Sequence, residues 1–82
     1  MDDEVEVGKQ AFIELVHEMD PQVQIVIPTR PTSDHFLISL TKGKGREFLS
    51  VSEGDILDLV EVPEIRKEVA QKVRETLQKI QQ

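Results

Sequence analysis

The chain has no cysteine, tryptophan or tyrosine, and only three phenylalanines among its 82 residues. The lack of cysteine excludes disulfides, thiol catalysis and the usual structural zinc sites, and it is typical of cytoplasmic proteins. No apolar run approaches the roughly 18 residues that a membrane-spanning helix needs. The first residues, Met1–Glu4, are acidic, whereas a secretory signal begins with basic residues. We therefore expect a cytoplasmic protein that does not contact membranes.

Positive charge is scarce in the first quarter of the chain. Residues 1–20 contain seven acids and one base, Lys9, whereas residues 21–82 contain nine acids and nine bases. The net charge of −6 therefore belongs to the N-terminal segment. Such a charge distribution repels nucleic acid and anionic membranes. Charge runs of this kind usually form a solvated face, and the alternative is a docking site for a basic partner.

Two segments have the spacing of amphipathic helices. The first covers residues 5–19, can begin anywhere from Asp3 to Lys9, and ends at Asp20-Pro21 because a residue before proline is disfavoured in a helix. The second covers residues 64–80, after Pro63. A short helix is expected between them, since Ser52 followed by Asp55 forms a typical N-terminal cap. The apolar stripes are Phe12, Leu15, Val16 and Met19 in the first helix, and Ile65, Val69, Val73, Leu77 and Ile80 in the last.

Residues 35–51 predict a β-hairpin at the centre of the fold. Gly43 and Gly45 are expected to supply the positive backbone angles of its turn. A turn centred on Gly43-Lys44 pairs Phe36 with Val51 and gathers the apolar side chains on one face, so burial favours this register. That face contains Phe36, Ile38, Leu40, Leu49 and Val51; the other contains Leu37, Ser39, Thr41, Arg46, Phe48 and Ser50.

A third strand is predicted at Val23–Ile27, where β-branched residues are frequent. The proline-containing segment 28–34 then forms a loop. Together these elements predict a single α+β domain over residues 1–82. It comprises an N-terminal helix, a three-stranded antiparallel sheet and a C-terminal helical pair broken near Pro63, in the order αβββα.

Catalytic and metal-binding patterns are absent from the sequence. There is no nucleophile-elbow motif and no histidine pair with metalloprotease spacing. His17 lies near several acids, but a metal site needs further converging ligands. Asp34 and His35 are neighbours on a strand and should point to opposite sides, which argues against a hydrolytic set with Ser39. We therefore expect no enzyme, no cofactor and no bound metal.

The hairpin tip concentrates positive charge. Lys42, Lys44 and Arg46, with Arg30 from the loop, suggest an anion or nucleic-acid contact as an alternative function. The order helix, three strands, helix is that of double-stranded RNA-binding domains, although one topology hosts many functions. That family presents a lysine cluster at the start of its last helix, whereas here the corresponding segment 53–58 is acidic. Nucleic acid is therefore not the partner we expect.

The second face of the hairpin is the better candidate site. Leu37 and Phe48 lie on it beside Arg46, a combination that suits a protein contact. The preceding strand should add Val26. We therefore predict a non-enzymatic protein-interaction domain that binds a protein partner, or itself as a homo-oligomer, through Leu37, Arg46 and Phe48. The alternative is that the C-terminal segment covers this face.

Overall fold

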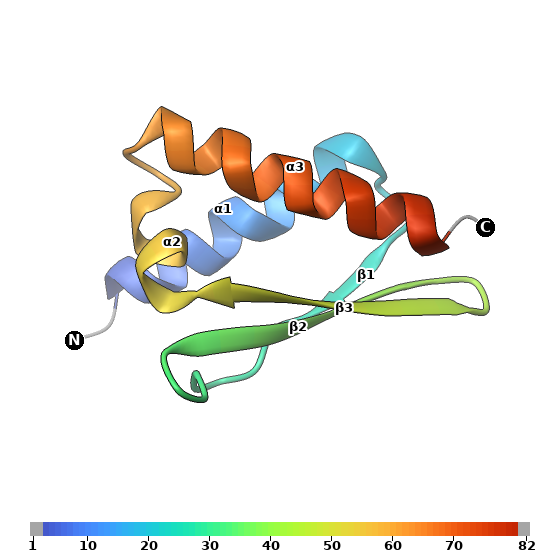
Figure 1. Ribbon diagram of the computed structural model, residues 1–82, viewed down its shortest axis with the longest axis horizontal. Helices are drawn as coiled ribbons and strands as arrows, with labels where there is room; N and C mark the ends of the chain where they lie inside the picture. The colour runs from blue at the N-terminus through green and yellow to red at the C-terminus, as the bar shows by residue number, and fades with distance from the viewer. Residues whose placement is uncertain (1–2, 81–82) are drawn as a thin grey trace.

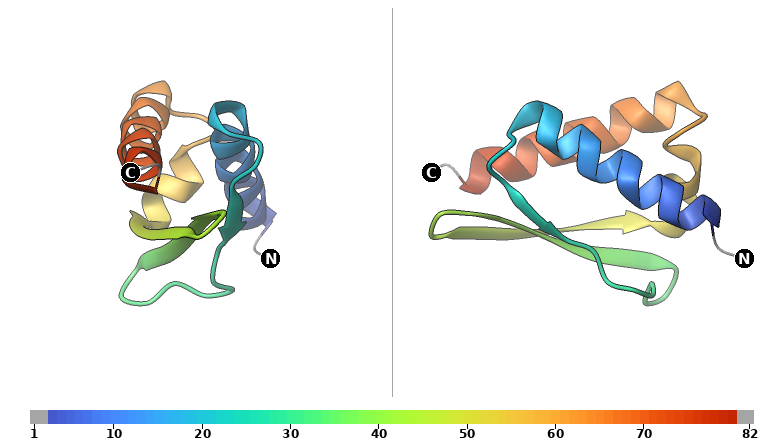
Figure 2. Two further views of the ribbon diagram at one scale, coloured as in Figure 1. Left: turned by 90° about the vertical axis from the view of Figure 1, so that its right-hand side faces the viewer. Right: turned by 180° about the vertical axis from the view of Figure 1, so that it is seen from behind.

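Three antiparallel strands form one sheet, and the helices lie on one side of it. The computed structural model describes residues 3–80. Along the chain the elements are α1 (Asp3–Met19), β1 (Gln24–Val26), β2 (His35–Lys42), β3 (Gly45–Ser52), α2 (Glu53–Asp58) and α3 (Pro63–Ile80), and the sheet order is β1-β2-β3. Figure 1 shows α1 and α3 running above the sheet. The left view of Figure 2 shows them side by side over one sheet face, with no helix on the other. The predicted α+β fold with the order αβββα is confirmed.

The central hairpin has the predicted register. Phe36 pairs with Val51, and Lys42 pairs with Gly45. Gly43 has a φ of 60°, as expected for glycine at the first central position of a two-residue turn. The prediction for Gly45 was wrong, because its φ is not positive. A Cβ atom on Gly45 would lie 2.8 Å from Cγ2 of Ile80, so glycine there lets the end of α3 approach the hairpin.

The core lies between the sheet and the helices. Along β2, exposure alternates: Phe36, Ile38 and Leu40 are fully buried, whereas the residues between them are more exposed. The two long helices supply the opposite side of the core, because their apolar stripes face the sheet. The buried apolar residues are Phe12, Leu15, Val16, Val23, Phe36, Ile38, Leu40, Leu49, Val51, Ile56, Leu59, Val69, Val73 and Leu77.

The helix boundaries follow local signals in the sequence. The Oγ atom of Ser52 accepts a hydrogen bond of 3.1 Å from the backbone N–H of Asp55, so the predicted cap of α2 is confirmed. α3 begins at Pro63, where the missing N–H costs no hydrogen bond. α1 begins at Asp3, within the predicted range. None of the helices within residues 3–80 is both long and apolar enough to cross a membrane.

Candidate interaction surface

The sheet face turned away from the helices carries alternate residues of all three strands. We call it the open face. Three large apolar side chains on it are more than half exposed: Val26 at 62%, Leu37 at 58% and Phe48 at 55%. The open face consists of Gln24, Val26, Leu37, Ser39, Thr41, Arg46, Phe48 and Ser50.

Strand pairing places these apolar side chains around one small residue. Ser39 pairs with Val26 on one side and with Phe48 on the other, so the three residues form a row across the sheet. Leu37 lies two positions from Ser39 on the same strand and is a diagonal neighbour of Phe48. The next row toward the hairpin tip is polar and contains Thr41 and Arg46. An apolar centre with a polar margin is the usual anatomy of a protein interface.

The structure brings together the three residues predicted to bind a partner. Leu37, Arg46 and Phe48 are all exposed on the open face. The alternative, in which the C-terminal segment covers this face, was wrong. Helix α3 packs on the opposite side of the sheet, with Val69, Val73 and Leu77 buried in the core. The sequence could not decide this point, because an amphipathic stripe does not specify which sheet face it covers.

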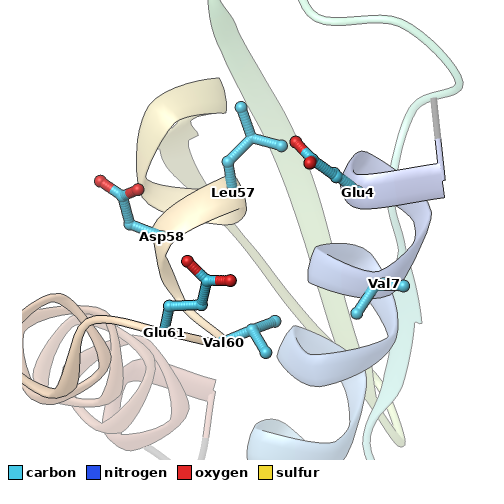
Figure 3. Close-up of a pocket in the computed structure, with 6 residues that line it drawn as sticks. All are labelled: Glu4, Val7, Leu57, Asp58, Val60 and Glu61. Carbon is cyan, nitrogen blue, oxygen red and sulfur yellow. The ribbon is translucent and has the colours of Figure 1, made fainter. Parts of the chain in front are cut away.

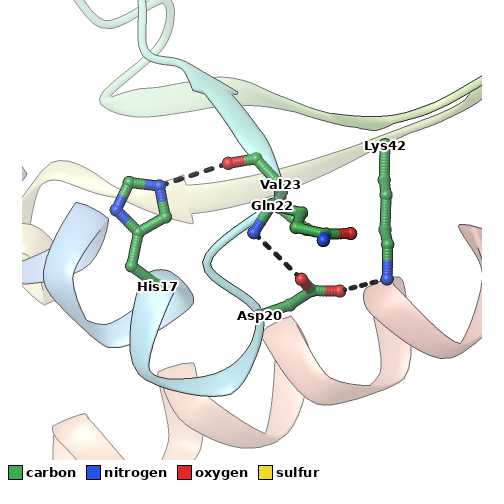
Figure 4. A network of polar contacts seen from close by, with 5 residues as sticks. All are labelled: His17, Asp20, Gln22, Val23 and Lys42. Atoms are coloured by element: carbon green, nitrogen blue, oxygen red, sulfur yellow. Dashed lines mark hydrogen bonds and ion pairs between the residues drawn. The ribbon is translucent and has the colours of Figure 1, made fainter.

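The cations of the hairpin tip do not act as one group. Lys42 points to the helix side, where its Nζ atom lies 2.6 Å from Oδ2 of Asp20 (Figure 4). Oδ1 of Asp20 accepts a second hydrogen bond of 3.0 Å from the backbone N–H of Gln22. The bond from Lys42, together with that from Gln22, lowers the pKa of the Asp20 carboxyl below its ordinary value. Lys42 therefore ties the hairpin to the end of α1.

The remaining cations lie apart from one another. Arg46 is on the open face, and Lys44 is exposed in the turn. Arg30 lies near Phe36 and Glu53, at the opposite end of the hairpin. The four cations named for an anion or nucleic-acid contact therefore do not form a continuous patch.

Both histidines have local hydrogen bonds. Nε2 of His17 lies 3.2 Å from the carbonyl oxygen of Val23 (Figure 4), and Nδ1 of His35 lies 2.9 Å from that of Ser33. Within residues 3–80, no group of three or more potential ligand side chains is placed to hold a metal ion.

The segment before β2 contains a tight turn that the sequence did not predict. Ser33 and Asp34 both have positive φ values, 51° and 63°. Thr32 and His35 exchange two backbone hydrogen bonds across them, of 2.8 and 3.0 Å. This is the pattern of a type I′ turn, which usually contains asparagine and glycine. Ser-Asp gives only a weak signal for it.

The sequence also did not predict a groove between α1 and the end of α2. Its volume is about 370 Å³, and Figure 3 shows its lining. Val7 and Val60 on its walls are 53% and 52% exposed. These residues are far apart in the sequence, and their proximity depends on the docking of α1 against α2. The lining residues are Glu4, Val7, Leu57, Asp58, Val60 and Glu61.

Comparisons with protein-family models, curated proteins and solved structures give no significant match to this chain.

Proposed function

We propose that this chain is a small non-enzymatic protein-interaction domain, which binds a protein partner or a second copy of itself through the open face. The observation that carries the proposal is the cluster of Val26, Leu37 and Phe48, each more than half exposed on a sheet face that the helices leave free. Exposure of clustered apolar surface to water is unfavourable. Covering it with a partner contributes roughly 25 cal/mol of binding free energy for each Å² of apolar area buried. The absence of cysteine supports a cytoplasmic setting.

The polar residues around the cluster support specific binding. Arg46 and Thr41 form one margin, and Ser50 lies beside Leu37 on the edge strand β3, so hydrogen-bonding groups border the apolar cluster on two sides. No ion pair within residues 3–80 involves the guanidinium group of Arg46. An arginine at the rim of an aromatic cluster can pair with a carboxylate of the partner.

The proposal is tested by introducing a charge at the centre of the open face. Phe48→Glu should remove association, because the carboxylate must remain hydrated. Val60→Glu is the matched control, since Val60 is exposed to a similar extent but lies outside the sheet. Tagged wild-type and variant proteins are compared by sedimentation for self-association and by affinity capture for other partners.

Circular dichroism should be unchanged in both variants, since both residues are exposed. We expect the wild type and Val60→Glu to retain the same partners, and Phe48→Glu to lose them. Identical behaviour of all three proteins, or unfolding of Phe48→Glu, would contradict the proposal.

A further inference from the structure

Strand β3 leaves one long edge of the sheet unpaired. It runs over eight residues, Gly45–Ser52, and pairs with β2 on one side; within residues 3–80 no strand pairs with its other side. The opposite edge of the sheet is β1, which has only three residues. An edge strand presents a row of free backbone N–H and C=O groups, and these can pair with an added strand.

The register determines which groups of β3 point outward. In an antiparallel pair, hydrogen-bonded residue pairs alternate with pairs that are not hydrogen-bonded. The N–H of Glu53 donates a 2.8 Å hydrogen bond to the C=O of Asp34, and these residues continue the register in which Val51 pairs with Phe36. Odd-numbered residues of β3 therefore bond to β2. The backbone groups of Arg46, Phe48 and Ser50 point to the free edge.

The residues with free backbone groups also carry side chains of the open face. Arg46, Phe48 and Ser50 all belong to it. Because side chains alternate along a strand, every second residue of β3 has both a free backbone N–H and C=O and a side chain on the open face. A strand added at this edge would therefore enlarge the open face and lie directly beside Phe48.

We propose that the added strand is β3 of a second copy, paired antiparallel about a twofold axis at Phe48. This inference goes beyond the proposed function, because pairing at the β3 edge brings the two Phe48 side chains together but leaves the open face free for another partner. The two Phe48 side chains then face each other, and Arg46 of each copy lies opposite Ser50 of the other. Both pairs join residues whose backbone groups point outward, as the hydrogen bonds require. The product is a six-stranded sheet with one continuous open face.

The charges at the two ends of β3 favour a second copy over an arbitrary strand. Lys44 and Arg46 lie at its beginning, and Glu47 beside them points to the helix side. The segment after its end carries Asp55 and Asp58 and no base, while Glu53 in that segment lies near Arg30. Antiparallel pairing places the basic end of each β3 beside the acidic end of the other. The complementarity occurs twice because the interface is twofold symmetric.

The first test measures the oligomeric state and the backbone amides of the full chain. Sedimentation from about 1 μM to about 1 mM, the range of weak associations, should show conversion of monomer to dimer. In the monomer, amide hydrogen exchange should be slow at Leu49 and Val51 and fast at Phe48 and Ser50. On dimer formation, the amides of Phe48 and Ser50 should become slow.

Variants at Ser50 test the edge without changing the core. Ser50→Pro removes an outward N–H and should abolish the dimer, since an edge strand tolerates proline at such a position. Ser50→Glu places a carboxylate opposite Arg46 of the second copy and should tighten the dimer roughly threefold to tenfold, whereas Ser50→Lys should weaken it by a similar factor. These two variants keep the test valid if Ser50→Pro does not fold.

The possible results separate this inference from the proposed function. A wild type that remains monomeric over the whole range overturns self-pairing, while loss of another partner in Phe48→Glu would still support the open face. A dimer that is lost in Phe48→Glu but indifferent to all three Ser50 variants overturns edge pairing in favour of face-to-face contact. Dimer formation with protection of Phe48 and Ser50 amides supports the inference.

Discussion

Gly8 lies in α1 at the point where this helix contacts α2. From the sequence, this glycine predicts only a weak first helical turn, since glycine is a poor helix former. The structure shows that a Cβ atom there would overlap the backbone oxygen of Ile56. Glycine is therefore required at this position because Ile56, almost fifty residues further along the chain, packs directly against the backbone of α1. No local pattern in the sequence could have revealed this contact.

We predict that Gly8→Ala lowers the free energy of unfolding by about 1–3 kcal/mol, because the new methyl group overpacks the contact between α1 and α2. Gly54→Ala is the matched control. Gly54 is also helical, but a Cβ atom there would meet no atom within 4 Å. It should raise stability by about 0.5 kcal/mol through the higher helix propensity of alanine. Urea denaturation of both variants tests this, and similar effects at the two sites would contradict it.

Asp20 makes stability dependent on pH. Its carboxylate accepts hydrogen bonds from Lys42 and from the Gln22 amide, which hold its pKa below the ordinary 3.8. A lowered folded-state pKa means that the unfolded chain binds the proton more readily. The stabilisation is therefore fully present well above pH 3.8 and is lost as the pH falls through the folded-state value.

We predict that Asp20→Asn is less stable than the wild type at pH 7 and loses less stability on acidification. Chemical denaturation at pH values from neutral to below 3.8 measures how steeply the free energy of unfolding of each protein falls with pH. Glu18→Gln is the control, because the Glu18 carboxylate pairs with Arg66 on the surface, where its side chain is 66% exposed. Exposed pairs contribute little, so this variant should follow the wild type. Equal slopes for Asp20→Asn and the wild type would refute the assigned role.

At the scale of elements, the hairpin separates core from surface between adjacent residues. Ile38 is fully buried and Leu37 is 58% exposed. We predict that Ile38→Ala lowers the free energy of unfolding by about 2–5 kcal/mol, because it removes buried methyl groups and leaves a cavity. Leu37→Ala should change it by no more than about 0.5 kcal/mol, as is usual at exposed positions. Thermal or urea unfolding compares the two, and comparable losses would show that the open face is covered.

The hairpin was predictable because two independent signals agree on its register. The Gly43-Lys44 turn and the burial pattern both pair Phe36 with Val51, and a shift by one residue would expose the whole apolar face. The turn at Ser33-Asp34 had no comparable support. Serine and aspartate can adopt the left-handed conformation but do not favour it as glycine does. The bridged residues Thr32 and His35 are both exposed, so no buried apolar side chain indicates their pairing.

At the scale of the whole molecule, the sequence predicts the elements and their order but not how the helices dock. The stripe of α3 identifies its buried residues, and Val69, Val73 and Leu77 are indeed in the core. Whether α3 packs on the sheet face that α1 covers or on the face that carries Phe48 depends on the length and direction of the connection after β3. The same reason explains why the groove beside Val7 and Val60 could not be foreseen, since it exists only after α1 and α2 have met.

The short strand β1 limits how far the sheet can grow. If two β3 edges are joined, the sheet edges that remain within residues 3–80 are the two copies of β1, each with three residues and followed closely by Pro28 and Pro31. Proline and shortness are the means by which natural sheets prevent further strand addition. In the proposed dimer, growth by strand addition would therefore stop at two copies, which gives a finite assembly and not a fibre.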